Sequence, residues 1–195
     1  MSEYPPPLPP TDLSIDALKA LAHPLRQSML TRLQRHGPAT SADLSVEFDV
    51  DRGASSYHLR QLARYGFIEQ DAARSAGRRK YWRAIPQDLR LPREPRDSET
   101  AVVADAVGRQ WMDRAAAELR AYLEDRESFG EFAGAAMHSF GTVALTAEEL
   151  SAFGEEYVAL LNRWRRDAGS ADAASRPITV VFHAFPTPDM WRTSP

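Results

Sequence analysis

The 195-residue chain contains no cysteine. Disulfides, thiolate metal ligands and a cysteine nucleophile are therefore excluded, which agrees with a reducing cytoplasm. No apolar run reaches the ~20 residues of a membrane-spanning helix, and the N-terminus lacks the charged-then-apolar pattern of a secretion signal. We expect a cytoplasmic protein with no membrane partner.

A net positive charge is also missing, since the formal net charge is -3 at pH 7. The charge is unevenly distributed, however. Residues 13–90 hold 13 Lys and Arg against 8 Asp and Glu, whereas residues 91–195 hold 11 against 17. A basic front half joined to an acidic back half indicates two parts with different partners.

Sequence motifs of catalysis are absent too. The chain has no phosphate-binding glycine loop, no nucleophile elbow and no paired metal-ligand motif. His138 and His183 fall in two predicted strands, but two histidines without a third ligand make a poor zinc site. We therefore predict no enzyme activity, no metal and no cofactor.

Two helices are predicted at the start of the front half. Ser14 is placed to cap the first, which runs to about Ala22. The second begins at Pro24, because the residue before proline leaves helical geometry while proline itself suits the first turn. Gly37 and Pro38 end this second helix.

Two more helices and a hairpin follow. Thr40 and Asp43 form a capping box at the start of a short third helix. Asp51 caps a fourth helix, which Gly66 ends in the left-handed conformation. Residues 67–85 read as two strands joined by a basic turn around residues 75–77. We expect residues 1–11 to be a disordered, proline-rich tail and residues 86–98 to be a linker.

The fourth predicted helix has two unlike faces. Leu59, Leu62 and Ala63 share one face, which we expect to be buried. The opposite face carries Tyr57, Arg60, Gln61 and Arg64. A solvated helix surface would also explain these side chains. The capped short helix before them and the basic hairpin after them favour DNA, because a helix fits the major groove and reads its donors and acceptors there.

The order helix, helix, short helix, helix, hairpin is that of a winged helix-turn-helix. Residues 18–48, "LKALAHPLRQSMLTRLQRHGPATSADLSVEF", followed by "SSYHLRQLARYGFIE", resemble the ArsR-type winged-helix repressors. The stretch "AHPLR", the Ser-x-His-Leu step at Ser56 and the Gly-Phe-Ile exit at Gly66 carry the resemblance, which covers about residues 13–85. It implies a homodimeric DNA-binding transcriptional regulator. We predict repression, and the sequence leaves activation open as the alternative.

The chain departs from this family at its sensor sites. Metal sensors of the family use cysteines in the third helix or histidine and aspartate pairs in the last helix. The third helix here has no cysteine, and residues 99–129 contain no histidine. The family's metal sites are therefore not expected, and about 65 residues extend beyond the length of a small sensor.

The predicted DNA-binding residues come from the third and fourth helices and from the hairpin. The set is Thr40, Ser41, Arg52, Ser55, Ser56, Tyr57, His58, Arg60, Gln61, Arg64, Arg74, Arg78, Arg79 and Lys80. The face with Tyr57 and Arg60 is expected to enter the groove, while the serines and Thr40 fix the register on phosphates. The hairpin cations supply affinity and salt dependence. For His58, a hydrogen bond within the fold or to a phosphate is as well supported as base contact.

The back half is predicted to contain a long helix over residues 98–129. Its apolar stripe is Val103, Val107, Trp111, Ala115, Leu119 and Tyr122. A small front domain cannot cover this stripe, so we predict a dimer interface. Two strands, residues 136–145 and 178–185, flank a last helix that Thr146 and Glu149 cap.

The predicted fold class is mainly α with small β. A winged helix-turn-helix domain (12–92) precedes a linker and dimerisation helix (93–129) and a small α+β region (130–195) for dimerisation or effector binding. Two alternatives stay open: a small-molecule-sensing module, or a protein-interaction module that keeps the winged-helix shape without specific DNA binding. The sequence also leaves open whether the last two strands pair within one chain or between two.

Overall fold

The computed structural model describes residues 10–188 except residues 78, 94, 96 and 165–173. The chain divides into two compact units, one ending at Ala116 and the other beginning at Ala117. This boundary lies inside a long helix. It therefore falls within the predicted linker and dimerisation segment (93–129) and not at either end of that segment. In the part of the chain that the structure describes, no helix is both long and apolar enough to cross a membrane.

The first unit holds the four predicted front helices: α1 (Ile15–Leu21), α2 (Pro24–His36), α3 (Ser41–Glu47) and α4 (Arg52–Arg64). The predicted caps are confirmed. Ser14 Oγ accepts from the backbone N of Ala17 at 3.2 Å, and Asp51 Oδ1 accepts from the first turn of α4. Gly66 has a φ of +74°, so the chain leaves α4 in the left-handed conformation that glycine adopts without strain.

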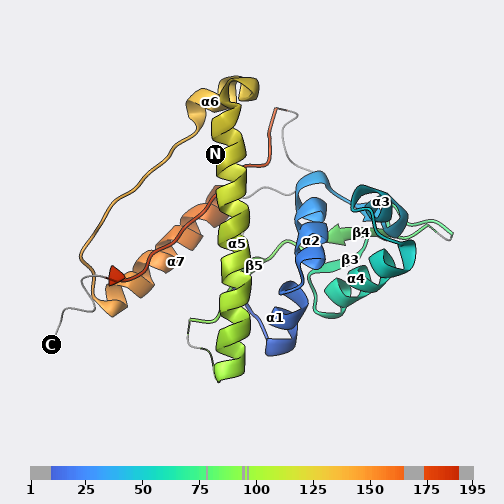
Figure 1. The fold of residues 1–195 in the computed structure, drawn as a ribbon, viewed down its shortest axis with the longest axis horizontal. Helices are drawn as coiled ribbons and strands as arrows, with labels where there is room; N and C mark the ends of the chain where they lie inside the picture. Colours follow the sequence, from blue (N-terminus) through green and yellow to red (C-terminus); the bar gives the residue numbers. More distant parts are fainter. Residues whose placement is uncertain (1–9, 78, 94, 96, 165–173, 189–195) are drawn as a thin grey trace. The chain divides into compact units, whose positions relative to one another are not determined.

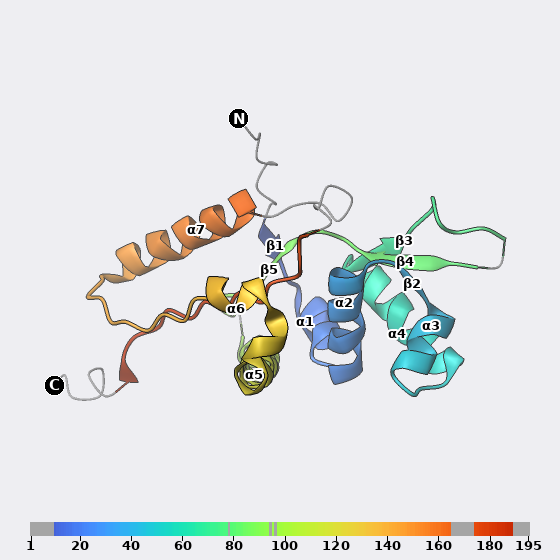
Figure 2. The same ribbon diagram turned by 90° about the horizontal axis from the view of Figure 1, so that it is seen from above.

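The predicted hairpin is confirmed as β3 (Ile68–Gln70) and β4 (Tyr81–Ala84). Its turn closes where Ala76 and Arg79 exchange backbone hydrogen bonds of 3.1 and 3.0 Å. A third strand, β2 (Ala39–Thr40), pairs antiparallel with β4, which gives the order β2-β4-β3. Two residues are too few to show an alternating pattern, so the sequence did not indicate β2. Figure 2 shows the hairpin turn extending past α3 and α4.

A second pair of strands corrects the prediction for the tail and the linker. Strand β1 (Pro10–Asp12) pairs in parallel with β5 (Asp88–Arg90). Proline is tolerated at the first residue of a strand, and Pro10 occupies that position. Pro10 and Thr11 are therefore not part of a disordered tail, while residues 1–9 lie outside the described residues.

The core of the first unit is formed by side chains from α1, α2, α4, β3 and the start of the long helix α5 (Ser98–Glu124). Leu59, Leu62 and Phe67 are completely buried there. Val107 of α5 is also completely buried, and Trp111 packs against the same core. Val107 is thus unavailable to a dimer partner, because the front domain covers this part of the predicted stripe itself.

Polar side chains fix the first part of α5 against α2. Gln27 Nε2 donates to the Leu21 carbonyl at 2.7 Å and to Gln110 Oε1 at 2.6 Å. Gln110 Nε2 in turn donates to the Ala22 carbonyl at 3.0 Å, and Arg114 donates to the Gln27 carbonyl at 3.3 Å. Since Gln27 is buried, these bonds define one position of α5 on α2.

The second unit begins with the end of α5. A 3₁₀ turn (Arg126–Phe129), the short helix α6 (Glu131–Ala135) and α7 (Ala147–Trp164) follow (Figure 1). The predicted capping box of α7 is confirmed, because the Thr146 backbone N donates to Glu149 Oε2 at 2.7 Å and the Glu149 N donates to Thr146 Oγ1 at 3.2 Å.

The two predicted strands of the second unit are not formed. Residues 136–145 and 178–185 have no strand partner among the described residues. Strand propensity reflects packing on a sheet, so a suitable composition produces no strand without a neighbour. The α+β description of this region is therefore wrong for the described residues, whereas the overall class, mainly α with a small antiparallel sheet, is confirmed.

Candidate nucleic-acid interface

A hollow of about 490 Å³ lies where α3, α4 and the hairpin meet. Its lining residues are Thr40, Ser41, Ala42, Asp43, Arg52, Ser56, Arg60, Gln70, Arg79, Lys80 and Trp82. Seven of these residues belong to the predicted DNA-binding set, although they come from three separate stretches of sequence. The fold thus brings most of the predicted phosphate contacts to one concave surface; their contact with DNA stays a prediction.

The hollow is strongly cationic. Arg52, Arg60, Arg79 and Lys80 contribute positive charge, and Asp43 contributes the single carboxylate. All four cations are exposed. A concave surface with charge of one sign concentrates an oppositely charged ligand, so this hollow suits a phosphate backbone.

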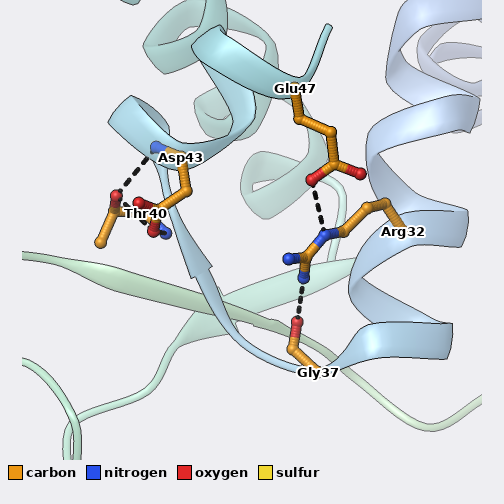
Figure 3. A network of polar contacts seen from close by, with 5 residues as sticks. All are labelled: Arg32, Gly37, Thr40, Asp43 and Glu47. Atoms are coloured by element: carbon orange, nitrogen blue, oxygen red, sulfur yellow. Dashed lines mark hydrogen bonds and ion pairs between the residues drawn. The ribbon is translucent and has the colours of Figure 1, made fainter.

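The Asp43 carboxylate is held by the capping box (Figure 3). Its Oδ2 accepts from the backbone N of Thr40 at 2.9 Å and from Thr40 Oγ1 at 2.8 Å. These bonds, helped by the positive charges of Arg79 and Arg32, lower the pKa of Asp43. Thr40 is 6% exposed and its hydroxyl proton is engaged, so Thr40 organises the start of α3 and cannot donate to a phosphate.

One flank of α4 faces the hollow. Arg52, Ser56 and Arg60 recur every fourth residue and so lie along the same side of the helix. The predicted groove-reading face lies beside this flank: Tyr57 is half exposed, and the exposed Arg64 has its guanidinium 5.6 Å from the Tyr65 ring centroid. Gln61 is partly buried. Arg60 therefore belongs to both surfaces.

Ser55 is wrongly placed in the predicted set. The side chain is completely buried, and its Oγ has no hydrogen-bond partner among the described residues. Ser55 lies four and seven residues before Leu59 and Leu62, which puts it on the core face of α4. Ser56, one residue later, lines the hollow.

His58 is turned toward the start of α2. Its ring centroid lies 4.6 Å from that of His23 and 5.4 Å from that of Tyr57. Both histidines have a buried Nδ1 without a partner among the described residues. Burial, followed by the charges of His23 and Arg26, lowers the pKa of His58. Of the three interpretations of His58, contact within the fold agrees best with this position.

Only some of the predicted hairpin cations lie at the hollow. Arg79 and Lys80 line the hollow, and the Arg79 guanidinium lies 5.7 Å from the Tyr81 ring centroid. Arg74 is exposed outside the hollow, with its Nε 3.7 Å from Asp71 Oδ2. Arg78 lies outside the described residues.

Four lining residues lie outside the predicted DNA-binding set: Ala42, Asp43, Gln70 and Trp82. Ala42 and Asp43 directly follow the predicted Ser41, and Asp43 was identified from the sequence only as part of the capping box. Gln70 and Trp82 are paired across β3 and β4 in the antiparallel register. Trp82 is two residues beyond Lys80, and residues two apart in a strand share a face. Alternation from Lys80 would have indicated Trp82; Gln70 depends on the register, which the sequence did not fix.

Arg32 of α2 contacts Glu47 and Gly37 (Figure 3). Its Nε lies 2.9 Å from Glu47 Oε2, and one terminal nitrogen donates to the Gly37 carbonyl at 2.9 Å. These contacts join α2 to the end of α3 and to the loop before β2. Arg32 therefore helps to fix the position of α3, whose first residues line the hollow.

Among the described residues, no three His, Asp or Glu side chains group to hold a metal ion.

Residues 21–71 match the family model of a helix-turn-helix domain. None of the curated proteins compared with the chain matches it.

Solved structures of regulators are similar to part of the chain. Reduced HlyU from Vibrio cholerae shares 20% identity over 49% of this chain and 84% of its own, with a TM-score of 0.32. A homodimeric winged helix-turn-helix DNA-binding domain of a possible ArsR-family regulator from Mycobacterium bovis shares 22% identity over 46% and 69%, with a TM-score of 0.31. A possible transcriptional regulator for arsenical resistance shares 26% identity over 53% and 95%, with a TM-score of 0.32.

The element order and the family-model match confirm the predicted winged helix-turn-helix domain. This architecture is that of DNA-binding transcriptional regulators, in agreement with the ArsR-like resemblance of residues 13–85.

Proposed function

We propose that the chain is a sequence-specific DNA-binding transcriptional regulator. The observation that carries the proposal is the cationic hollow, to which α4 and the hairpin of a helix-turn-helix domain both contribute. Phosphate contacts position such a protein on the duplex, while base contacts select the sequence. Both kinds of group lie on or beside one helix here.

The two tasks fall to different side chains. Arg52, Arg79 and Lys80 neutralise phosphates, and Ser41 and Ser56 donate hydrogen bonds to them. Arg60 has the length and position to reach from the hollow to a base edge, together with Tyr57, Gln61 and Arg64 on the adjoining face. An arginine reads guanine through O6 and N7, so a guanine opposite Arg60 is the natural target.

The exposed face of α5 supports a homodimer. Val102, Met112, Leu119 and Leu123 are its exposed large apolar side chains. With the exposed Asp105, Arg109 and Ala116, they recur at alternating intervals of three and four residues, which is the spacing of a coiled-coil seam. We infer that this stripe, rather than the predicted one containing Val107, contacts a partner helix.

A two-fold dimer would present two recognition helices to successive major grooves. Within this proposal the protein is a repressor, as predicted from the sequence. A small-molecule effector acting through the C-terminal region, residues 130–195, stays a prediction.

The test is fluorescence anisotropy with DNA from upstream of the protein's own gene, beside a scrambled duplex, across a salt series. The expected result is salt-dependent binding with a clear preference for the upstream DNA. Equal affinity for both duplexes at every salt concentration would contradict specific recognition of that DNA. No binding even at low salt would contradict DNA binding and favour a protein partner for α4.

A further inference from the structure

The second unit leaves most of its large apolar side chains in solvent. Of its described residues, only Asn162 is fully buried. Phe140 is completely exposed, and Met137, Trp164 and Phe185 are more than half exposed. Nothing among the described residues of the single chain closes a core here.

Residues 178–185, with the sequence Ile-Thr-Val-Val-Phe-His-Ala-Phe, are the clearest strand-forming stretch of this unit. The segment is attached to helices by two side chains. Phe182 stacks on Tyr157 with centroids 4.0 Å apart and planes at 11°, and Thr179 Oγ1 donates to Glu118 Oε2 at 2.7 Å. One side is thus anchored, yet no described segment forms a ladder with its backbone.

The side chains of this segment are apolar on both faces. In an extended chain Val181 and Phe185 point one way, and Val180 points the other with Phe182. Val180, Val181 and Phe185 are all at least half exposed. Strands that are apolar on both faces belong inside a covered sheet. The segment therefore has the composition of a paired strand without its pair.

The exposed area is large enough for a stable interface. At 150–250 Å² per aromatic side chain, the exposed fractions of Phe129, Phe140, Phe153, Trp164 and Phe185 amount to roughly 500–800 Å². A standard interface buries about 800 Å² per partner. Summed over the unit, these exposed aromatic side chains therefore approach the area that one partner contributes to a standard interface.

The occupant that fits best is a second copy of the chain. A strand beside a two-fold axis pairs antiparallel with its own copy, which needs no other complementary sequence. Leu119 and Leu123, at the end of the exposed α5 stripe, belong to the same unit, so one partner copy would meet both the stripe and the strand. A small ligand fits less well, because such ligands bind in concave sites that enclose most of their surface.

We propose that residues 178–185 of two chains pair as antiparallel strands, with the exposed residues of 137–145 covering the resulting ribbon. The proposal rests on the homodimer proposed above and adds a second, β-sheet interface to the α5 contact. The apolar second unit is then half of a shared core.

Hydrogen exchange of the full-length protein tests this pairing. Samples are measured above and below the dimer dissociation concentration, which light scattering after size exclusion establishes. Amides of residues 179–185 should exchange at least ~10-fold more slowly in the dimer and lose this protection on dilution. Strand β4 (Tyr81–Ala84) serves as the internal reference, because its ladder lies within one chain.

A variant pair gives a second measurement. Val181→Pro removes an amide donor and should weaken dimerisation at least ~10-fold, whereas Val181→Thr keeps the strand and should weaken it little. Since the chain has no cysteine, Val181→Cys can also be cross-linked by a short bismaleimide. Val46→Cys, exposed on α3, is the matched control that should not cross-link.

The outcomes separate the two proposals. A monomeric wild-type protein would overturn both. A dimer whose 179–185 amides exchange rapidly at every concentration, and which Val181→Pro leaves equally tight, would overturn the strand pairing and leave the α5 dimer. Protection that persists on dilution would also overturn it, because the partner would lie in the same chain.

Discussion

The two units of this chain differ in how they bury apolar residues. The first encloses its core within one chain: Leu18, Leu59 and Phe67 are completely buried. The second also contains helices, α6 and α7, yet Phe140 and Phe185 remain in solvent. Well-formed helices alone therefore do not make a core, because helices and sheets must cover one another's apolar faces.

The largest contrast is expected in core truncations. Phe67→Ala should lower the free energy of unfolding by about 3–5 kcal/mol, because it leaves a cavity in a closed core. Phe140→Ala should change it by less than about 0.5 kcal/mol in the monomer, since the ring has no neighbours to lose. Urea unfolding at low protein concentration measures both.

The same two variants sharpen the comparison at high protein concentration. Phe140→Ala should then weaken the dimer, while Phe67→Ala should act through folding. A loss from Phe140→Ala as large as that from Phe67→Ala under monomeric conditions would show that the second unit closes its own core.

The contrast also explains what the sequence could predict. Helix ends depend on near neighbours, so the caps at Ser14, Thr40, Asp51 and Thr146 were all predicted correctly. Strand pairing depends on distant partners. The hairpin was predicted because its partners are close in sequence, whereas β1 with β5 was missed and residues 136–145 and 178–185 were assigned strands that they do not form.

The candidate site shows the same difference between local features, which the sequence predicts, and features that depend on the fold. The cations of α4 and the hairpin were identified from local composition, and the fold brings Arg52, Arg60 and Arg79 together. The sequence predicted less well on which face of a helix each side chain lies, because successive side chains in a helix point in directions that differ by about 100°. Ser55 and Ser56 differ by that single step, and the core face takes Ser55.

The next largest effect is expected for Arg60→Ala. Loss of a base contact should raise the Kd for the operator by about 5–150-fold, equivalent to ~1–3 kcal/mol, and should affect random DNA much less. Arg163→Ala on α7 removes the same charge from the second unit and is the matched control. Anisotropy titrations with both duplexes make the comparison, and an equal loss on the two sequences would exclude base reading by Arg60.

The two threonine capping boxes offer a closer comparison. Thr40→Ala should cost about 0.5–2 kcal/mol of unfolding free energy, because Thr40 is buried between α3 and β4. Thr146→Ala removes the same motif from α7 but should shorten only that helix, because Thr146 is exposed. Chemical denaturation followed at the first unit distinguishes them; a comparable loss of its unfolding free energy from Thr146→Ala would contradict an effect confined to α7.

The effect of Thr40 should also depend on pH. Its hydrogen bonds lower the pKa of Asp43 from 3.8 in the folded state, so the folded carboxylate holds its charge to lower pH than the unfolded one. The stabilisation is therefore complete above that ordinary value and is lost as the pH falls through the lower, folded-state pKa. The stability difference between wild type and Thr40→Ala should therefore be largest at neutral pH and should narrow in acid, because the bond from Thr40 Oγ1 to Asp43 Oδ2 needs the charged carboxylate. The bond from the Asp43 backbone N to Thr40 Oγ1 does not depend on pH, so part of the difference should remain.

The smallest effect concerns the histidines of the two units. Burial, followed by the charge of Arg26, lowers the pKa of His23, and burial with His23 and Arg26 lowers that of His58. Tyr57 of α4 contacts the His58 ring, and Arg26 of α2 lies close enough to lower the pKa of both histidines. The neutral forms are favoured in the folded state, so below the ordinary value of 6.5 the unfolded chain binds more protons and stability falls.

His58→Gln should therefore flatten the decline of stability between pH 7 and pH 5, whereas His183→Gln, which changes an exposed residue of the second unit, should leave that decline unchanged. Thermal unfolding across this pH range measures the two slopes. An identical flattening by both variants would place the pH dependence outside the first unit's core. Retention of the wild-type slope by His58→Gln would show that the contact between His23 and His58 does not couple protonation to folding.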